Sequence, residues 1–133
     1  MFAKLLSKAR EYMMTTIFGK QIRTTNAQPD ELISLWAAMN PAQLSGDIYA
    51  VYSNYESDFN GAYDFLIGTT TTTGDHCITI PPQQYEVIDV EPATPEAVYQ
   101  AWQKIWASDR TRAYAVDFEL YEANGAIKIF LSI

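Results

Sequence analysis

The chain of 133 residues carries an internal duplication, and this limits the folds that are open to it. The segment 29–36, Pro-Asp-Glu-Leu followed by Leu-Trp, matches 95–102, Pro-Glu-Ala-Val followed by Ala-Trp. Tyr-Ala-Val occurs at 49–51 and again at 114–116, and Asn-Gly-Ala occurs at 60–62 and again at 124–126. Three matches in the same order, with a slowly drifting offset, predict two related structural units.

Each unit is predicted to contain a strand, a helix and two further strands. In the first unit a helix is expected over 28–39, where Asn26 can cap it and Pro29 suits its first turn. The apolar residues of this segment recur at helical spacing, at Leu32, Leu35, Trp36 and Met39. Alternating and β-branched residues, with an Asn-Gly turn between the last two runs, predict strands over 14–23, 47–55 and 62–70.

The second unit repeats this plan. Thr-Pro-Glu at 94–96 is typical of a helix start, so a helix is predicted over 95–107. The strand before it, 76–91, is expected to be interrupted by two prolines at 81–82, as at a bulge or a sheet edge. A closing hairpin that again turns at Asn-Gly is predicted over 112–122 and 126–133.

The predicted architecture is α+β: a tandem duplication with pseudo-twofold symmetry, in which two helices cover one antiparallel sheet or two half-sheets. The chain is expected to form one domain, with the first repeat at 13–73, the second at 74–133 and a short helix or tail at 1–12. A cleft is expected where the halves meet, because ligand sites favour such seams.

The composition of the chain argues against several classes of function. The formal net charge of −7 argues against direct binding of nucleic acid, and no apolar run approaches the length of a membrane span. Cys77 is the only cysteine, so no internal disulfide can form, which fits a reducing cytoplasm. The single histidine, His76, is its neighbour; a thiolate or imidazole metal site is therefore not expected, and neither is a cofactor.

The most informative strand is 114–121, Tyr-Ala-Val-Asp-Phe-Glu-Leu-Tyr. Period-2 alternation places Asp117 and Glu119 on one face and apolar residues on the other. Two interpretations of Glu119 follow from the residues. It is either a solvated carboxylate, paired with Arg112 or Lys128, or a carboxylate at the floor of a cavity.

Two longer stretches resemble a known family. Tyr-Ala-Val-Tyr-Ser-Asn-Tyr-Glu-Ser-Asp at 49–58 and Tyr-Asp-Phe-Leu-Ile-Gly at 63–68 resemble the effector-binding domain of AraC-type and multidrug-responsive transcription regulators, the gyrase-inhibitory-protein-like (GyrI-like) family. Ile-Thr-Ile-Pro at 78–81 and Asp-Phe-Glu-Leu-Tyr at 117–121 are similar to its second half, and the resemblance covers about 14–133. It implies the tandem fold and a central aromatic pocket that binds lipophilic cations.

By this resemblance Glu119 is the buried glutamate that meets the cation. The helix-turn-helix module usually fused to such domains has no counterpart here, so the chain resembles a free-standing domain of the kind carried on mobile integron cassettes. Tyr121, on the same strand face, and Tyr52, on another strand, are predicted to line the pocket with Glu119. Tyr49 completes the strand residues of the predicted site, with the sheet core as its alternative position.

Two tryptophans complete the predicted site. Trp36 and Trp102 occupy matching positions of the two helices, where core packing and cation–π contact with a ligand are both open. Packing alone is expected for Trp106.

The predicted function is non-enzymatic binding of amphipathic, cationic small molecules, by sequestration or by signalling to a partner protein. One alternative is a hydrolase acting on electrophilic small molecules, with Glu119 as general base and a neighbouring tyrosine as acid. Another is an acidic module that binds or inhibits a protein such as a DNA topoisomerase. The sequence does not distinguish a monomer from a dimer.

Overall fold

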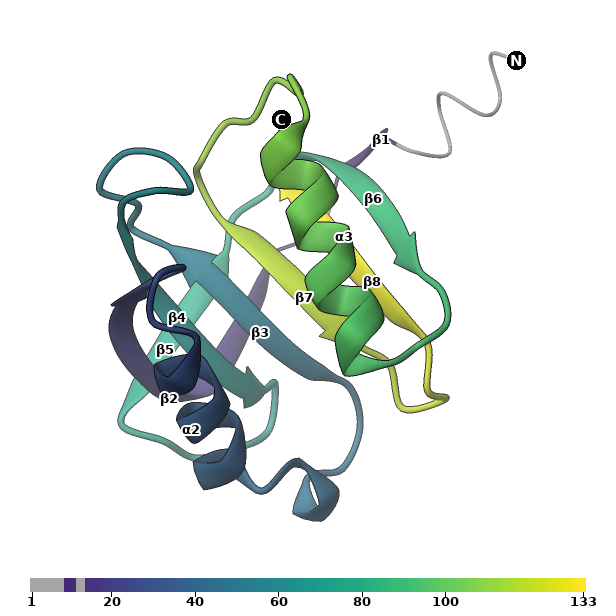
Figure 1. Ribbon diagram of the computed structural model, residues 1–133. Coiled ribbons are helices and arrows are strands. Elements are labelled where there is room, and N and C mark those ends of the chain that lie inside the picture. The colour runs from purple at the N-terminus through teal and green to yellow at the C-terminus, as the bar shows by residue number, and fades with distance from the viewer. Residues whose placement is uncertain (1–8, 12–13) are drawn as a thin grey trace.

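The computed structural model describes residues 9–11 and 14–133 (Figure 1). In this part of the chain, strands and helices follow the order predicted for a duplicated unit, with one short strand added before each unit. The elements are β1 (Ala9–Glu11), β2 (Thr15–Thr25), α2 (Pro29–Met39), the 3₁₀ helix η1 (Pro41–Gln43), β3 (Ile48–Ser53), β4 (Ala62–Thr69), β5 (His76–Ile80), β6 (Gln84–Val90), α3 (Pro95–Ala107), β7 (Asp117–Tyr121) and β8 (Ile127–Ser132).

All eight strands form one antiparallel sheet in the order β1-β6-β8-β7-β3-β4-β2-β5. Strands β2, β3 and β4 of the first unit lie on one side of its centre, and β6, β7 and β8 of the second unit lie on the other. β3 and β7 pair at the centre, where Ala50 lies opposite Glu119. The predicted α+β duplication, with two helices over an antiparallel sheet, is confirmed.

The two units exchange their first strands. β5 precedes β6 in the chain but pairs with β2 of the first unit, and β1 precedes β2 but pairs with β6 of the second. The expectation of one strand interrupted at 81–82 is therefore wrong, because β5 and β6 lie in different parts of the sheet. The expected sheet edge is present, since β5 is the last strand in the sheet order. The expected N-terminal helix is also wrong over Ala9–Glu11, which forms β1, and the rest of 1–12 lies outside the described residues.

Both helices lie on the same face of the sheet, α2 over the first unit and α3 over the second (Figure 1). α3 begins as predicted, with the Thr94 hydroxyl accepting a hydrogen bond from the backbone N–H of Ala97. Asn26 does not cap α2, contrary to expectation. Its side chain donates a hydrogen bond to the Phe59 carbonyl and accepts one from the Tyr63 hydroxyl. It therefore links the segment before α2 to the β3–β4 hairpin.

Two hydrophobic cores lie on opposite faces of the sheet. The first is between the sheet and the helices and includes Leu35 of α2 and Trp102 of α3. The second lies on the face without helices and brings Ile80 of β5 into one cluster with Tyr85 of β6. These strands are far apart in the sheet order, yet only residues 81–83 connect them. The sheet must therefore curl until its ends approach, and this curl buries the second core.

A pair of glycines allows two strands to approach closely within the curled sheet. Gly19 of β2 lies opposite Gly68 of β4. A Cβ atom on either would lie 1.9 Å from a backbone oxygen of the other strand, which no side chain tolerates. Only glycine fits both positions.

Two expectations for the second unit need correction. The strand predicted over 112–122 is shorter, because only Asp117–Tyr121 pairs with its neighbours. Tyr114 precedes this strand in a loop with a left-handed φ of 51°, whereas Tyr49 lies within β3. The Tyr-Ala-Val match is therefore not a match of strand positions.

Neither helix in the described part of the chain is long and apolar enough to cross a membrane.

Candidate ligand-binding site

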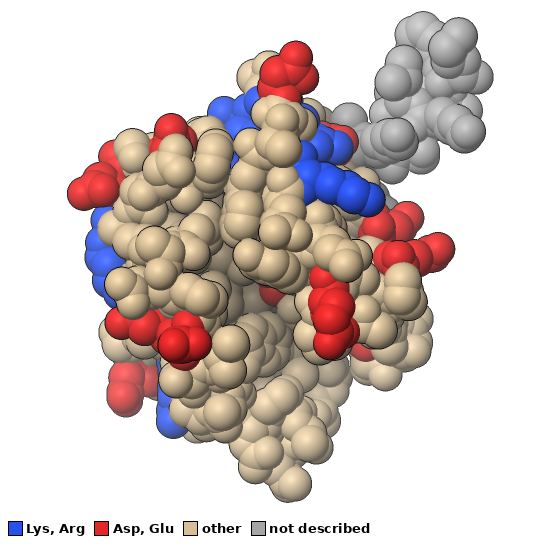
Figure 2. All heavy atoms as spheres, viewed as in Figure 1, with Lys and Arg blue, Asp and Glu red and all other residues tan. Residues whose placement is uncertain are grey.

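A cavity of about 340 Å³ lies between α2, α3 and the centre of the sheet. Figure 2 shows the helix-bearing face of the molecule hollowed between the two helices, with acidic side chains distributed around it. Aromatic side chains supply more than half of the lining. The lining residues are Asn26, Pro29, Leu32, Ile33, Trp36, Tyr52, Tyr55, Phe59, Tyr63, Pro95, Val98, Tyr99, Trp102, Trp106, Arg112, Glu119 and Tyr121.

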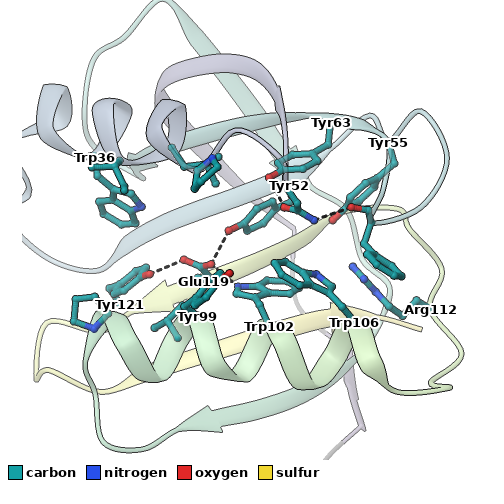
Figure 3. Close-up of a pocket in the computed structure, with 17 residues that line it drawn as sticks. Trp36, Tyr52, Tyr55, Tyr63, Tyr99, Trp102, Trp106, Arg112, Glu119 and Tyr121 are labelled. Carbon is teal, nitrogen blue, oxygen red and sulfur yellow. Dashed lines mark hydrogen bonds between the residues drawn. The ribbon is translucent and has the colours of Figure 1, made fainter.

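Glu119 lies at the floor of this cavity with 3% of its surface exposed. Three aromatic side chains donate hydrogen bonds to its carboxylate, as Figure 3 shows. The Tyr52 hydroxyl and the indole N–H of Trp102 both donate to Oε2 at 2.7 Å, and the Tyr121 hydroxyl donates to Oε1 at 2.5 Å. Among the described residues, no cationic side chain forms an ion pair with Glu119.

Strand alternation explains how Glu119 reaches the cavity. Phe118 and Leu120 point into the core on the opposite face, so the residues between and beside them face the helices. Ala50, directly opposite on β3, is fully buried and has only a methyl side chain. The space above the centre of the sheet is therefore left to Glu119 and the aromatic residues around it.

Burial dominates the electrostatics of this cluster. It raises the pKa of Glu119 above the usual range of a glutamate, although the hydrogen bonds from Tyr121, Tyr52 and Trp102 act in the opposite direction. Burial, and then the nearby carboxylate, raise the pKa of Tyr52 and Tyr121, so both hydroxyls stay protonated and act as donors. The direct hydrogen-bond partners of this carboxyl group are thus all neutral side chains.

Asp117 lies two residues before Glu119 on the same strand face and has a different environment. Its Oδ2 forms a 2.9 Å ion pair with Nη2 of Arg112 and accepts a hydrogen bond from the Tyr55 hydroxyl at 2.6 Å. Its Oδ1 accepts the backbone N–H and the hydroxyl of Ser132, each at 2.7 Å. This carboxylate has its countercharge within the protein.

The structure brings five of the six predicted site residues to the cavity: Glu119, Tyr121, Tyr52, Trp36 and Trp102. Tyr49 is the exception. It lies on the opposite face of the sheet, in the core of Phe118, because β3 alternates and Tyr52 points toward the helices.

The partners first considered for Glu119 are engaged elsewhere. Arg112 pairs with Asp117, and Lys128 pairs with Glu122. The interpretation of Glu119 as a solvated carboxylate is wrong, since the side chain is buried. Trp36 and Trp102 line the cavity from different helices, and Trp36 packs edge-on against Tyr121 with ring centroids 5.0 Å apart.

Several lining residues were missed by sequence reasoning. Trp106 lines the cavity and also packs against Trp102, and its position one helical turn beyond Trp102 was a usable signal. Tyr63 could also have been identified, because alternation along β4 places it on the face that lines the cavity. No local pattern points to Tyr55 or Arg112, which lie outside helices and strands.

A cavity lined in this way can enclose an apolar or aromatic molecule and place one carboxylate against it. In the described part of the chain, no group of His, Cys, Asp and Glu side chains is arranged to hold a metal ion.

Comparison with known proteins gives a consistent result. The chain matches the family described as "Cass2: Integron-associated effector binding protein" over residues 11–133. It is 32% identical to YobU of Bacillus subtilis (strain 168), a protein named as a transcriptional regulator, with 82% of each chain covered.

Solved structures share the fold. The integron cassette protein VCH_CASS2 of Vibrio cholerae superimposes with a TM-score of 0.82 at 25% identity, covering 93% of each chain. SAV2435, solved bound to tetraphenylphosphonium, superimposes with a TM-score of 0.68 at 18% identity, covering 93% of this chain and 91% of its own. The chain thus belongs to the Cass2 family of integron-associated effector binding proteins, in keeping with its resemblance to GyrI-like domains.

Proposed function

We propose that this effector-binding protein binds lipophilic organic cations in the aromatic cavity and that Glu119 supplies the countercharge. The proposal rests mainly on one observation: Glu119 is buried at the floor of the cavity with hydrogen-bond donors around it but no cationic partner among the described residues. A buried carboxylate without a countercharge is costly. A ligand that brings a positive charge removes that cost.

The walls of the cavity support the same ligand class. Trp36, Trp102 and Tyr121 present ring faces and edges, and aromatic faces attract cations through their quadrupole. A volume of about 340 Å³ is at the lower end of the range in which proteins bind small organic molecules. A quaternary phosphonium or ammonium ion with aromatic substituents suits this combination of charge and apolar surface.

The comparison with SAV2435 adds support at the level of the fold. That protein was solved bound to tetraphenylphosphonium, a lipophilic cation, and shares the fold at 18% identity. A fold of this kind can therefore admit such a ligand.

Recognition of this type is expected to be broad. The countercharge interaction is non-directional, and a quaternary cation donates no hydrogen bond. Selection would depend on charge, size and aromatic contact, so chemically unrelated cations should compete for one site.

The test is a calorimetric titration of tetraphenylphosphonium into the wild type, Glu119→Gln and Glu96→Gln. Glu96 is exposed at the start of α3, so its variant makes the same change of net charge outside the cavity. We expect micromolar binding to the wild type, on the order of −8 kcal/mol, and a loss of about 30-fold in Glu119→Gln. Glu96→Gln should bind within about twofold of the wild type, as expected for a screened surface charge.

Equal affinity of Glu119→Gln and the wild type would refute the role of Glu119. No binding of any quaternary cation to the wild type would refute the proposed ligand class.

A further inference from the structure

Arg112 contributes a buried positive group to the cavity, and its hydrogen-bonding capacity is largely unused. Its side chain is 5% exposed and forms one short bond, from Nη2 to Asp117 at 2.9 Å. A second contact, from Nη1 to the Tyr114 hydroxyl, is long at 3.5 Å. Nε is buried and has no hydrogen-bond partner among the described residues. A guanidinium has five N–H donors, so most of this one's capacity is unused.

Arg112 has unused hydrogen-bond donors, whereas its partner Asp117 is fully hydrogen-bonded. Asp117 accepts three further hydrogen bonds, from Tyr55 and from the backbone and hydroxyl of Ser132. Its charge is therefore well stabilised, and Arg112 is free to use its other donors. A buried donor without an acceptor is unfavourable, which marks this position as one that a ligand can complete.

Trp102 lies between Arg112 and Glu119 and contacts both. The indole of Trp102 donates to Glu119 at 2.7 Å, and its ring lies 5.8 Å from Cζ of Arg112. Arg112 thus lies over the indole ring, and Glu119 lies at its N–H edge. Figure 3 shows Arg112 beyond Trp102 and Trp106, at the end of the cavity away from Trp36 and Tyr121.

We propose that Arg112 forms a second polar subsite, which binds a carbonyl oxygen of the ligand at the end opposite its cationic group. This inference rests on the proposed function and narrows its ligand class to lipophilic cations that also carry an ester, amide or ketone. A carbonyl suits the subsite better than a carboxylate, because a second anion would lie beside Asp117. Because Nε is shielded from water, the guanidinium must turn slightly to present it. This movement is made over the Tyr114 ring, whose centroid lies 4.2 Å from Cζ, and against one short hydrogen bond, to Asp117.

The test compares two triphenylphosphonium ions with chains of equal length, one ending in a methyl ester and one in an alkyl group. The quantity measured is the ratio of their dissociation constants, in the wild type and in Arg112→Met/Asp117→Asn. The double substitution removes both charges, so neither is left buried alone. We expect the ratio to favour the ester about 10-fold more in the wild type than in the variant, equivalent to about 1.4 kcal/mol.

Tetraphenylphosphonium, which has no oxygen, separates the two proposals. If it binds both proteins equally and the ratio falls as expected, the subsite is supported. If it binds both proteins and the ratio is the same in both, the subsite is refuted and the proposed function stands. If it does not bind the wild type, both proposals fail.

A measurement on the wild type alone covers the case in which the variant does not fold. The Nε–H resonance of Arg112 is followed by nitrogen-15 NMR with each ligand at saturation. The ester should shift this resonance and slow its exchange with water, and the alkyl analogue should not. Identical spectra with the two ligands would overturn the proposal.

Discussion

Asp117 and Glu119 are two carboxylates on the same face of the same strand, and only Asp117 has a cationic partner among the described residues. Asp117 is fully buried and is paired with Arg112 inside the protein. Glu119 is 3% exposed and receives only hydrogen bonds from neutral aromatic side chains. Burial alone therefore does not mark a ligand site. The distinguishing feature of Glu119 is burial beside the cavity without a cationic partner in the described part of the chain.

The largest expected contrast between the two carboxylates is in folding stability. Asp117→Ala should lower the free energy of unfolding by about 3–5 kcal/mol, because it leaves Arg112 buried and unpaired and removes two bonds to Ser132. Glu119→Gln should change it by about 1 kcal/mol or less, since the amide oxygen can accept from Tyr52 and Trp102 while the amide NH2 donates to the Tyr121 hydroxyl oxygen. Urea unfolding of both variants measures the difference. Equal losses would mean that Glu119 is as structural as Asp117.

The second contrast concerns the pH dependence of ligand binding. A cation favours the ionised form of Glu119, so binding releases a proton wherever the raised pKa keeps the free protein protonated. Affinity for tetraphenylphosphonium should therefore rise with pH, by up to about tenfold per unit, and level off above that pKa. Titration calorimetry across the pH range measures this. Glu119→Gln should give a flat profile, and an equally flat wild-type profile would contradict the prediction.

A smaller effect is expected from one donor to Glu119. Tyr121→Phe removes the hydrogen bond to Oε1, which acts to lower the pKa of Glu119. The pKa of Glu119 should therefore rise further, and the midpoint of the binding profile should move to higher pH. Tyr99→Phe is the matched control, because Tyr99 lines the cavity without a hydrogen bond to Glu119 in the structure. Equal shifts in both variants would exclude a specific role for the Tyr121 hydroxyl.

The smallest expected effect is on the pH dependence of stability without ligand. The folded-state pKa of Glu119 lies above its unfolded value, so its protonation favours the folded state at low pH. This contribution is lost as the pH rises from the ordinary glutamate range through the raised pKa. Urea unfolding of the wild type and Glu119→Gln at a series of pH values measures it. Parallel stability curves for the two proteins would contradict the raised pKa.

Much of the fold could be predicted because its signals are local. Helical spacing of apolar residues located both helices, and two Asn-Gly sequences located the turns of both hairpins. Strand parity placed Asp117 and Glu119 on one face and separated them from Phe118 and Leu120. These patterns reflect backbone geometry over a few residues, and a single sequence displays them directly.

The errors arose where a segment's structure depends on a distant partner. Two prolines between β5 and β6 fit a bulge as well as a crossover, and nothing local reports that β5 pairs with β2. Arg112 and Tyr55 reach the cavity from irregular segments, which have no periodicity to interpret. Tyr49 is a different kind of error, because the alternation of β3 already places it on the opposite face from Tyr52.

The sequence by itself determined that this protein has two related halves, two helices on an antiparallel sheet, and two carboxylates on one face of a strand. Tertiary structure alone decided which charges are paired. The pairing of Arg112 with Asp117, and not with Glu119, depends on a loop, on the curl of the sheet and on the register of β7 against β8. Electrostatic partnership is a matter of a few ångströms in space, and sequence spacing does not specify such distances between segments that are far apart in the chain.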